Sequence, residues 1–153
     1  MFAGRLTQLS LRALDWLAAH TLSPDALPAH QLTGRRGEEE AYFYLRRKGY
    51  IIIARNYRSP HHRGELDLVG WDHDVLCFIE VKTRSTRDIK PAEGAVDRDK
   101  QRELRLAARD FLRHMPLSCR SRFDVLAIYY EAGRGTSFEL FQNAFSASVS
   151  YNH

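Results

Sequence analysis

The chain has 153 residues, of which 44% are hydrophobic and 27% are charged, and its formal net charge at pH 7 is +4. This length suits one domain with a sizeable core, and the composition argues against wholesale disorder. No apolar run approaches the roughly 18 residues that span a bilayer, so we expect no membrane partner, whereas the basic balance favours polyanionic partners.

The two cysteines, Cys77 and Cys119, form neither a disulfide framework nor a metal-ligand spacing. Cys77 lies within the apolar run VLCFI and is expected to be a small core residue. This cysteine usage favours a cytoplasmic protein.

Residues 1–20 are expected to form an amphipathic helix, because apolar residues recur there at helical spacing. Charged and polar residues interrupt this stretch, which argues against a signal peptide. The helix is expected to dock on its own domain or on a second copy. Attachment to a membrane surface is the weaker alternative, because the polar face of the helix is not rich in Lys and Arg. Pro24 and Pro28 then mark a linker, so we divide the chain into residues 1–31, helix and linker, and a compact domain over residues 32–153.

The compact domain is predicted to be α/β, with a mixed sheet flanked by helices. A helix over residues 38–48 has three glutamates at its start, basic residues at its end and Gly49 after it; Thr33 or a neighbour is expected to cap it. A second helix is predicted over residues 96–115, after a polar loop at 85–95. The strands are expected at residues 50–57, 64–71, 75–83, 122–131 and 137–142.

The hairpin formed by residues 64–71 and 75–83 carries charges on strands that are otherwise apolar enough to be core. Glu80 and Lys82 are two residues apart and therefore share one face of their strand. In an antiparallel hairpin, a loop with an even number of residues near Asp72 and His73 places Asp67 on that same face, whereas a three-residue loop separates them. Buried charges cost free energy unless they pair with each other or bind a metal.

If these side chains converge, they suit Mg²⁺, with Mn²⁺ as a substitute, because Mg²⁺ prefers oxygen ligands. Asp67, Glu80 and the Val81 carbonyl are the expected ligands, and Lys82 is expected to orient the attacking water or stabilise the developing charge. Glu38 shares its helix face with apolar residues and could look inward as a further carboxylate. The alternative is a structural ion pair on a solvent-facing side of the sheet.

Several segments together resemble the YraN family of small nuclease-like proteins, in the PD-(D/E)xK nuclease superfamily. They are GRRGEEEAYFYLRRKGY, ARNYR, GELDLVGWD, FIEVKTR and RFDVLAI, and the resemblance covers roughly residues 32–142. It implies a restriction-endonuclease-like core of the Holliday-junction-resolvase type, in the order helix, three strands, helix, strand (αβββαβ), to which this chain adds an N-terminal helix. The proline of the superfamily's name is absent, because Leu66 precedes Asp67 here.

Carried over by position, the resemblance implies that Asp67 and Glu80 are metal ligands and that Lys82 is the catalytic lysine. Glu38 resembles the first-helix glutamate of the superfamily. Gln101, at the start of the second predicted helix, falls near a glutamine found in some related nucleases.

Basic residues gather just before the acidic hairpin, which suits contacts with a phosphate backbone. The residues considered for nucleic-acid contacts include Arg36, Arg63 and Gln101, together with Arg84, which follows the lysine at the strand end. Tyr57 and Trp71 are expected in the core or at its rim rather than stacked on bases. His61 and His62 are expected to be merely exposed.

The sequence thus predicts a cytoplasmic, Mg²⁺-dependent endonuclease that hydrolyses DNA phosphodiester bonds. Branched and duplex DNA fit equally, RNA stays open as a substrate, and a homodimer is compatible with the chain. A rival interpretation is a catalytically weak or inactive nucleic-acid-binding module that retains the nuclease fold. A third is a purely structural or adaptor protein.

Overall fold

A computed structural model of the chain describes residues 29–85, 96–115 and 119–147. The chain divides into two units, and the fold described here is that of the larger unit, Gly34–His153. The helix predicted over residues 1–20, and the linker as far as residue 28, lie outside the described residues. Neither described helix is long and apolar enough to cross a membrane.

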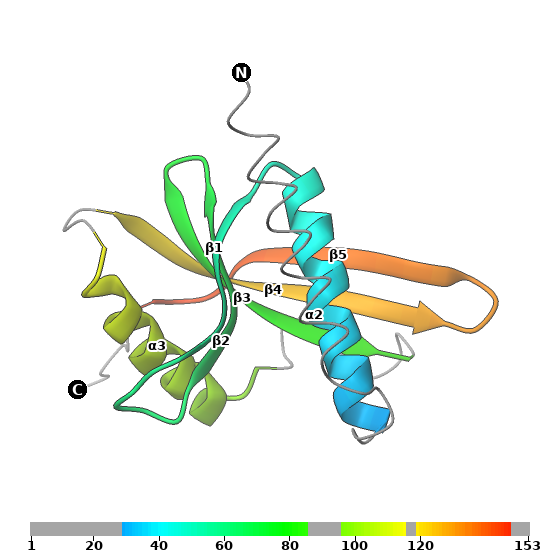
Figure 1. Cartoon of the computed structure of the whole chain (residues 1–153), viewed down its shortest axis with the longest axis horizontal. Coiled ribbons are helices and arrows are strands. Elements are labelled where there is room, and N and C mark those ends of the chain that lie inside the picture. The colour runs from blue at the N-terminus through cyan, green and yellow to red at the C-terminus, as the bar shows by residue number, and fades with distance from the viewer. Residues whose placement is uncertain (1–28, 86–95, 116–118, 148–153) are drawn as a thin grey trace, which may run out of the picture. The chain divides into compact units, whose positions relative to one another are not determined.

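Five strands form one mixed sheet in the order β1-β2-β3-β4-β5 (Figure 1). Neighbouring strands are antiparallel except β3 and β4, which are parallel because the chain crosses over through helix α3 between them. This is the predicted α/β class, with a sheet and helices consistent with a restriction-endonuclease-like fold. The strands are β1 (Ile51–Arg58), β2 (Glu65–Asp72), β3 (Val75–Arg84), β4 (Arg120–Glu131) and β5 (Gly135–Phe145).

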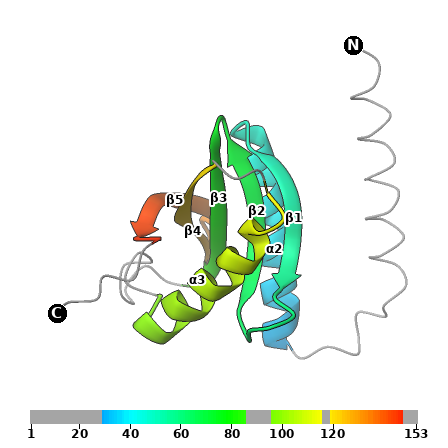
Figure 2. The same ribbon diagram turned by 90° about the vertical axis from the view of Figure 1, so that its left-hand side faces the viewer.

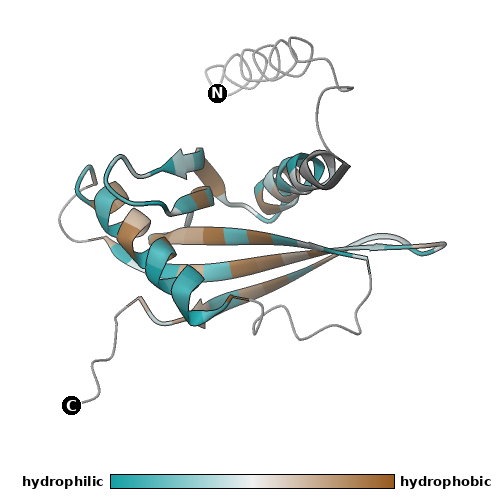
Figure 3. Ribbon diagram, turned by 90° about the horizontal axis from the view of Figure 1, so that it is seen from below, coloured by the Kyte–Doolittle hydropathy of each residue, from teal (hydrophilic) through white to brown (hydrophobic). Residues whose placement is uncertain are grey.

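The two helices, α2 (Ala29–Arg47) and α3 (Arg98–Leu112), cover opposite faces of the sheet (Figure 2). Side chains alternate along β3, so that Phe78 packs with residues of α3 whereas Cys77 and Ile79 pack with residues of α2. Hydrophobic residues accordingly colour the middle of the strands in Figure 3. The sheet therefore splits the core into two layers. Along β3, alternation decides which helix a residue meets, whereas β2 departs from it, since Leu66 and Leu68 lie in different layers.

Helix α2 begins at Ala29, nine residues before the predicted start, so the linker prediction is wrong for residues 29–31 and Thr33 lies inside the helix. Proline is tolerated at a helix start, so Pro28, which precedes Ala29 in the sequence, does not prevent it. The C-terminal end of α2, at Arg47, agrees with the prediction to within one residue. Gly49 has φ +95°, and the N–H of the following residue, Tyr50, donates to the Leu45 carbonyl at 3.0 Å, which is the hydrogen bond of a Schellman cap.

Helix α3 is shorter than predicted because Asp97 caps it. The Asp97 carboxylate accepts a hydrogen bond from the Lys100 backbone N–H at 2.8 Å. The residues that α3 buries against the sheet include Leu104, Ala107 and Ala108, an apolar stripe at helical spacing. Tyr57 and Trp71 are partly buried and pack against the same core layer, so they lie at the rim of the core, one of the two positions predicted for them.

Candidate active site

The β2–β3 hairpin has the even loop that the site requires. Asp72 pairs with Val75, which leaves a two-residue loop of His73 and Asp74, and the paired register continues to Leu68 opposite Ile79. Carried one residue further, this register sets Asp67 opposite Glu80. The loop has an even number of residues, as the prediction requires, although the turn lies one residue later than expected; that Asp67 shares the face of Glu80 and Lys82 stays a prediction.

Asp67 is tied to β3 by its side chain. Its Oδ2 accepts a hydrogen bond from the Val81 backbone N–H at 2.8 Å. A carboxylate thus reaches the backbone of β3 just beyond the last paired residues of the two strands. This contact fixes one carboxylate directly beside the Glu-x-Lys step.

Glu80 is only 5% exposed, and its two oxygens have different surroundings. Oε1 accepts a hydrogen bond from Lys82 Nζ at 2.8 Å and lies 3.6 Å from Lys100 Nζ of α3. Oε2 is buried and has no hydrogen-bond partner among the described residues. A buried carboxylate oxygen without a partner is costly, and native proteins retain such an atom where an ion or ligand completes it.

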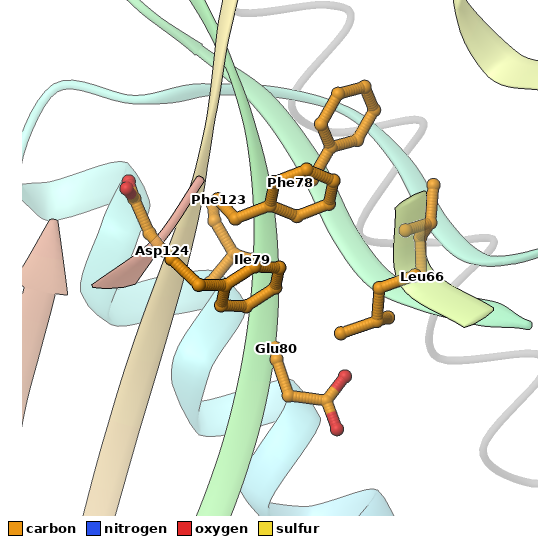
Figure 4. A pocket seen from close by; sticks show the side chains of 8 residues that line it. Leu66, Phe78, Ile79, Glu80, Phe123 and Asp124 are labelled. Carbon is orange, nitrogen blue, oxygen red and sulfur yellow. The ribbon is translucent and has the colours of Figure 1, made fainter. Parts of the chain in front are cut away.

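A group of apolar side chains packs next to Glu80. They come from α3 and from four strands, β2 to β5, and include Leu66, Phe78, Leu104 and Phe123; the space between them is too small for a water molecule. Figure 4 shows the Glu80 carboxylate at the edge of this group, pointing away from the aromatic rings. These apolar side chains lower the local dielectric constant, which strengthens the charge interactions of the Glu80 carboxylate.

Burial and the neighbouring Glu80 carboxylate raise the pKa of Asp67 to about 8, while the Val81 N–H and Lys100 act in the opposite direction. Desolvation disfavours the charged form, and two carboxylates that share one site repel each other. Around neutral pH, Asp67 therefore binds a proton unless a cation offsets the carboxylate charges.

The donor set at this point fits a divalent cation with oxygen ligands. Asp67 and Glu80 supply two carboxylates, one of them with an oxygen that lacks a partner. Magnesium is commonly held by one or two protein carboxylates and completes its shell with water and substrate phosphate. The part of the Val81 carbonyl as a ligand stays a prediction.

Glu38 does not join these two residues in a common cluster. It comes from α2, on the other face of the sheet, and within the described part of the chain no three His, Cys, Asp or Glu side chains group closely enough to hold a metal. Burial raises the pKa of Glu38, against a hydrogen bond with Asn56 of β1. Its charge still acts on Asp67, whose pKa it raises. A metal-ligand role for Glu38 stays a prediction.

Two glycines let both helices approach the sheet beside the site. A Cβ added to Gly64 would lie 2.3 Å from the Glu103 backbone oxygen of α3, and one added to Gly37 would lie 2.3 Å from Thr83 Cγ2 of β3. Gly64 directly precedes β2, and Thr83 directly follows Lys82. The absence of side chains at these two glycines therefore sets how closely α3 and α2 flank the acidic strands.

The four residues predicted to contact nucleic acid have different surroundings. Arg36 forms an ion pair with Glu40 at 2.8 Å and lies over the Tyr130 ring at 5.1 Å. Arg63 is exposed in the loop between β1 and β2. The guanidinium of Arg84 donates to the Thr83 carbonyl at 3.1 Å.

The fourth residue, Gln101, is engaged in the fold. Its amide donates to the Val96 carbonyl at 3.0 Å, and its oxygen accepts from Arg105 at 3.2 Å. These contacts secure the start of α3, one residue after the lysine that reaches Glu80. Nucleic-acid contacts by any of the four residues stay predictions.

Sequence reasoning missed Lys100. The available signal was its position four residues before Leu104 and seven before Ala107, on the stripe by which α3 faces the sheet. Glu40 accepts a hydrogen bond from the Tyr130 hydroxyl at 3.1 Å, whereas Glu39 is exposed.

Sequence reasoning also missed the residue that anchors the loop between β1 and β2. The Ser59 hydroxyl donates to the Asp110 carboxylate of α3, and its oxygen accepts from the backbone N–H groups of His61 and His62 at 3.2 and 3.1 Å. Ser59 and Asp110 are both buried. The two histidines are exposed, as expected.

A second buried charge group lies on the α2 face. Arg122 donates to both oxygens of Asp124, at 2.9 and 3.1 Å, and to Asp72 at 2.7 Å. Figure 4 shows Asp124 projecting to the side of the sheet opposite Glu80. This group links β2, β4 and the Tyr50 hydroxyl, to which Arg122 also donates, at 2.9 Å, and it is separate from the acidic site.

Comparisons with known proteins show the family to which the chain belongs. Residues 37–128 match the model of the "Uncharacterised protein family UPF0102". A UPF0102 protein of Koribacter versatilis is 52% identical over 125 residues, which cover 82% of this chain and 85% of the relative. A UPF0102 protein of Desulfosudis oleivorans is 39% identical over 124 residues, which cover 80% and 97%. The matched residues 37–128 include Asp67, Glu80, Lys82 and Lys100. The chain belongs to the UPF0102 (YraN) family, within the restriction-endonuclease-like superfamily.

Proposed function

We propose that this protein is a divalent-metal-dependent endonuclease that hydrolyses phosphodiester bonds in DNA. The observation that carries the proposal is the buried Glu80 carboxylate: its Oε2 lacks a partner among the described residues, Lys82 binds its other oxygen, and Asp67 binds the adjacent Val81 N–H. A structural ion pair would satisfy both oxygens of a buried carboxylate. Glu80 instead keeps one oxygen free for a ligand.

Each residue then has a defined part. Asp67 and Glu80 hold the cation, with the Val81 carbonyl as the further ligand and Glu38 acting on them from the α2 side. When bound, Mg²⁺ or Mn²⁺ supplies Lewis acidity to the phosphoryl group and makes water a better nucleophile. Lys82, held 2.8 Å from Glu80, keeps a positive charge where negative charge develops on the phosphate.

The surrounding basic residues supply the binding surface. Arg63 is exposed in the loop before β2 and Arg84 lies at the end of β3, so both flank the acidic strands in sequence. Contacts with phosphates predict an affinity that falls with rising salt concentration. The cytoplasm is the compartment that we propose, and both cysteines are free, as it requires.

The test is cleavage of linear, circular, branched and single-stranded DNA, and of RNA, in Mg²⁺, Mn²⁺ or EDTA. Asp67→Asn, Glu80→Gln and Lys82→Met keep the side-chain shapes, and each is expected to reduce cleavage by about 100-fold or more, as loss of a charge-stabilising group does. Glu39→Gln, at an exposed carboxylate outside the site, is the matched control. Undiminished cleavage in all three site variants would refute the assignment.

One observation favours the rival proposal of a nucleic-acid-binding module without useful catalysis. Two carboxylates, rather than a cluster of three acidic, histidine or cysteine side chains, come together within the described residues. A weakly held cation would leave the site protonated at neutral pH. Salt-sensitive binding to nucleic acid without metal-dependent cleavage of any substrate would decide for this rival.

A further inference from the structure

Lys100 has no assigned role in the proposed reaction, yet its position is unusual for a lysine. It lies in the first turn of α3, where the helix dipole is positive and a cation is disfavoured. Its backbone N–H is bound by the Asp97 cap, and its side chain lies on the stripe that α3 turns to the sheet. A residue that contradicts local helix preferences without a packing reason is a candidate for function.

The contact that Lys100 makes is weaker than that of Lys82. Lys82 Nζ is 2.8 Å from Glu80 Oε1 and forms a hydrogen bond, whereas Lys100 Nζ is 3.6 Å from the same oxygen, which is too long for one. The Lys100 side chain is 32% exposed, against 23% for Lys82. Lys100 is therefore the lysine that can leave Glu80 without breaking a hydrogen bond.

Charge balance gives this difference a consequence. One carboxylate oxygen, Glu80 Oε1, faces two ammonium groups, Lys82 Nζ at 2.8 Å and Lys100 Nζ at 3.6 Å. A divalent cation held by the carboxylates adds two positive charges, and the lysine with the weaker contact is then repelled. The nearest compensating anion in the proposed reaction is a phosphate of the substrate.

We propose that Lys100 is a substrate-positioning residue that pairs with Glu80 in the metal-free protein and transfers to a nucleic-acid phosphate when the cation is bound. This inference rests on the proposed function. The helix itself need not move, because Gly64 brings the start of β2 against the Glu103 backbone and so holds the second turn of α3 in place. The movement is confined to the flexible lysine side chain.

The first test is metal affinity without nucleic acid, measured by calorimetry or by Mn²⁺ electron paramagnetic resonance. Lys100→Met removes the competing charge and keeps the aliphatic stem, so Mn²⁺ is expected to bind roughly 3- to 30-fold more tightly than to the unaltered protein. Lys100→Arg keeps the charge and is expected to bind Mn²⁺ within about twofold of the unaltered protein. Arg102→Met, at an exposed position of the same helix, is the control for general loss of charge.

The second test is DNA affinity in Ca²⁺, over a range of salt concentrations. Lys100→Met is expected to lower the affinity and to reduce the slope of log K against log salt by about one phosphate contact, while Arg102→Met leaves the slope unchanged. Equal Mn²⁺ affinity in Lys100→Met and the unaltered protein would refute the inference while leaving the proposed endonuclease intact. Absence of Mn²⁺ binding to both proteins would overturn the proposed function and this inference together.

Discussion

The acidic site should destabilise the metal-free protein, and Asp67→Asn should relieve that cost. A carboxyl whose pKa rises from 3.8 to about 8 on folding binds its proton more tightly in the folded state. Its contribution to stability is complete below the unfolded pKa and is lost as the pH rises through the folded pKa. At about 1.4 kcal/mol for each pH unit, the full loss would be several kcal/mol.

Asparagine removes the charge and keeps an oxygen that can accept the Val81 N–H, so no cavity forms. The gain should be smaller than the full value for two reasons: the side chain at position 67 is only partly buried, and the asparagine amide loses solvation when it donates to Glu80. We therefore expect Asp67→Asn to raise the free energy of unfolding by about 1–3 kcal/mol at pH 8.5. For a domain of this size, each kcal/mol corresponds to roughly 3–5 °C in Tm.

The assay is urea unfolding in EDTA between pH 4.5 and 9, which compares Asp67→Asn with the unaltered protein. The stability difference should be smallest at the acid end, grow with pH and level off above about pH 8. Asp74→Asn, at a carboxylate whose side chain is 77% exposed, is the control and should show no such trend. A variant that is less stable than the unaltered protein at pH 8.5, or a difference independent of pH, would refute the reasoning.

Two further substitutions test the fold around the site. Arg122→Met should cost about 3–5 kcal/mol in urea unfolding, because it leaves the Asp124 carboxylate buried without its partner; if the double variant with Asp124→Leu is no more stable than Arg122→Met alone, this explanation fails. By the same urea unfolding, Gly64→Ala should cost about 1–3 kcal/mol, since its Cβ would meet the Glu103 backbone. Gly34→Ala, whose added Cβ would have nothing within 4 Å, should gain up to about 1 kcal/mol. Equal effects of the two alanine substitutions would contradict the close approach of α3.

The features of the site that depend on residues close together in sequence could be predicted. The even number of residues in the β2–β3 turn, on which the argument for Asp67, Glu80 and Lys82 was built, is a local property. The capping glycine at position 49 and the apolar stripe of α3 are local in the same sense. These elements were therefore predicted to within a few residues.

The rest depends on contacts between segments that are distant in sequence. The helical period shows that Glu38 faces inward, but it does not reveal which face of the sheet α2 will cover. Lys100 reaches Glu80 only because α3 docks closely on β2, which a single glycine contact permits. No periodicity in either segment encodes that distance, so the second lysine was missed.

The parallel pairing of β3 and β4 sets an order of assembly. The β1–β2–β3 meander closes through short loops, whereas Val75 can pair with Arg120 only after the whole crossover has been brought round. Closing the longer loop costs more chain entropy, so we expect the meander to form first. Asp67 and Glu80 would then come together before α3 docks and brings Lys100 to Glu80. Folding rates should accordingly respond more to Leu68→Ala than to Leu126→Ala, and the reverse ranking would contradict this order.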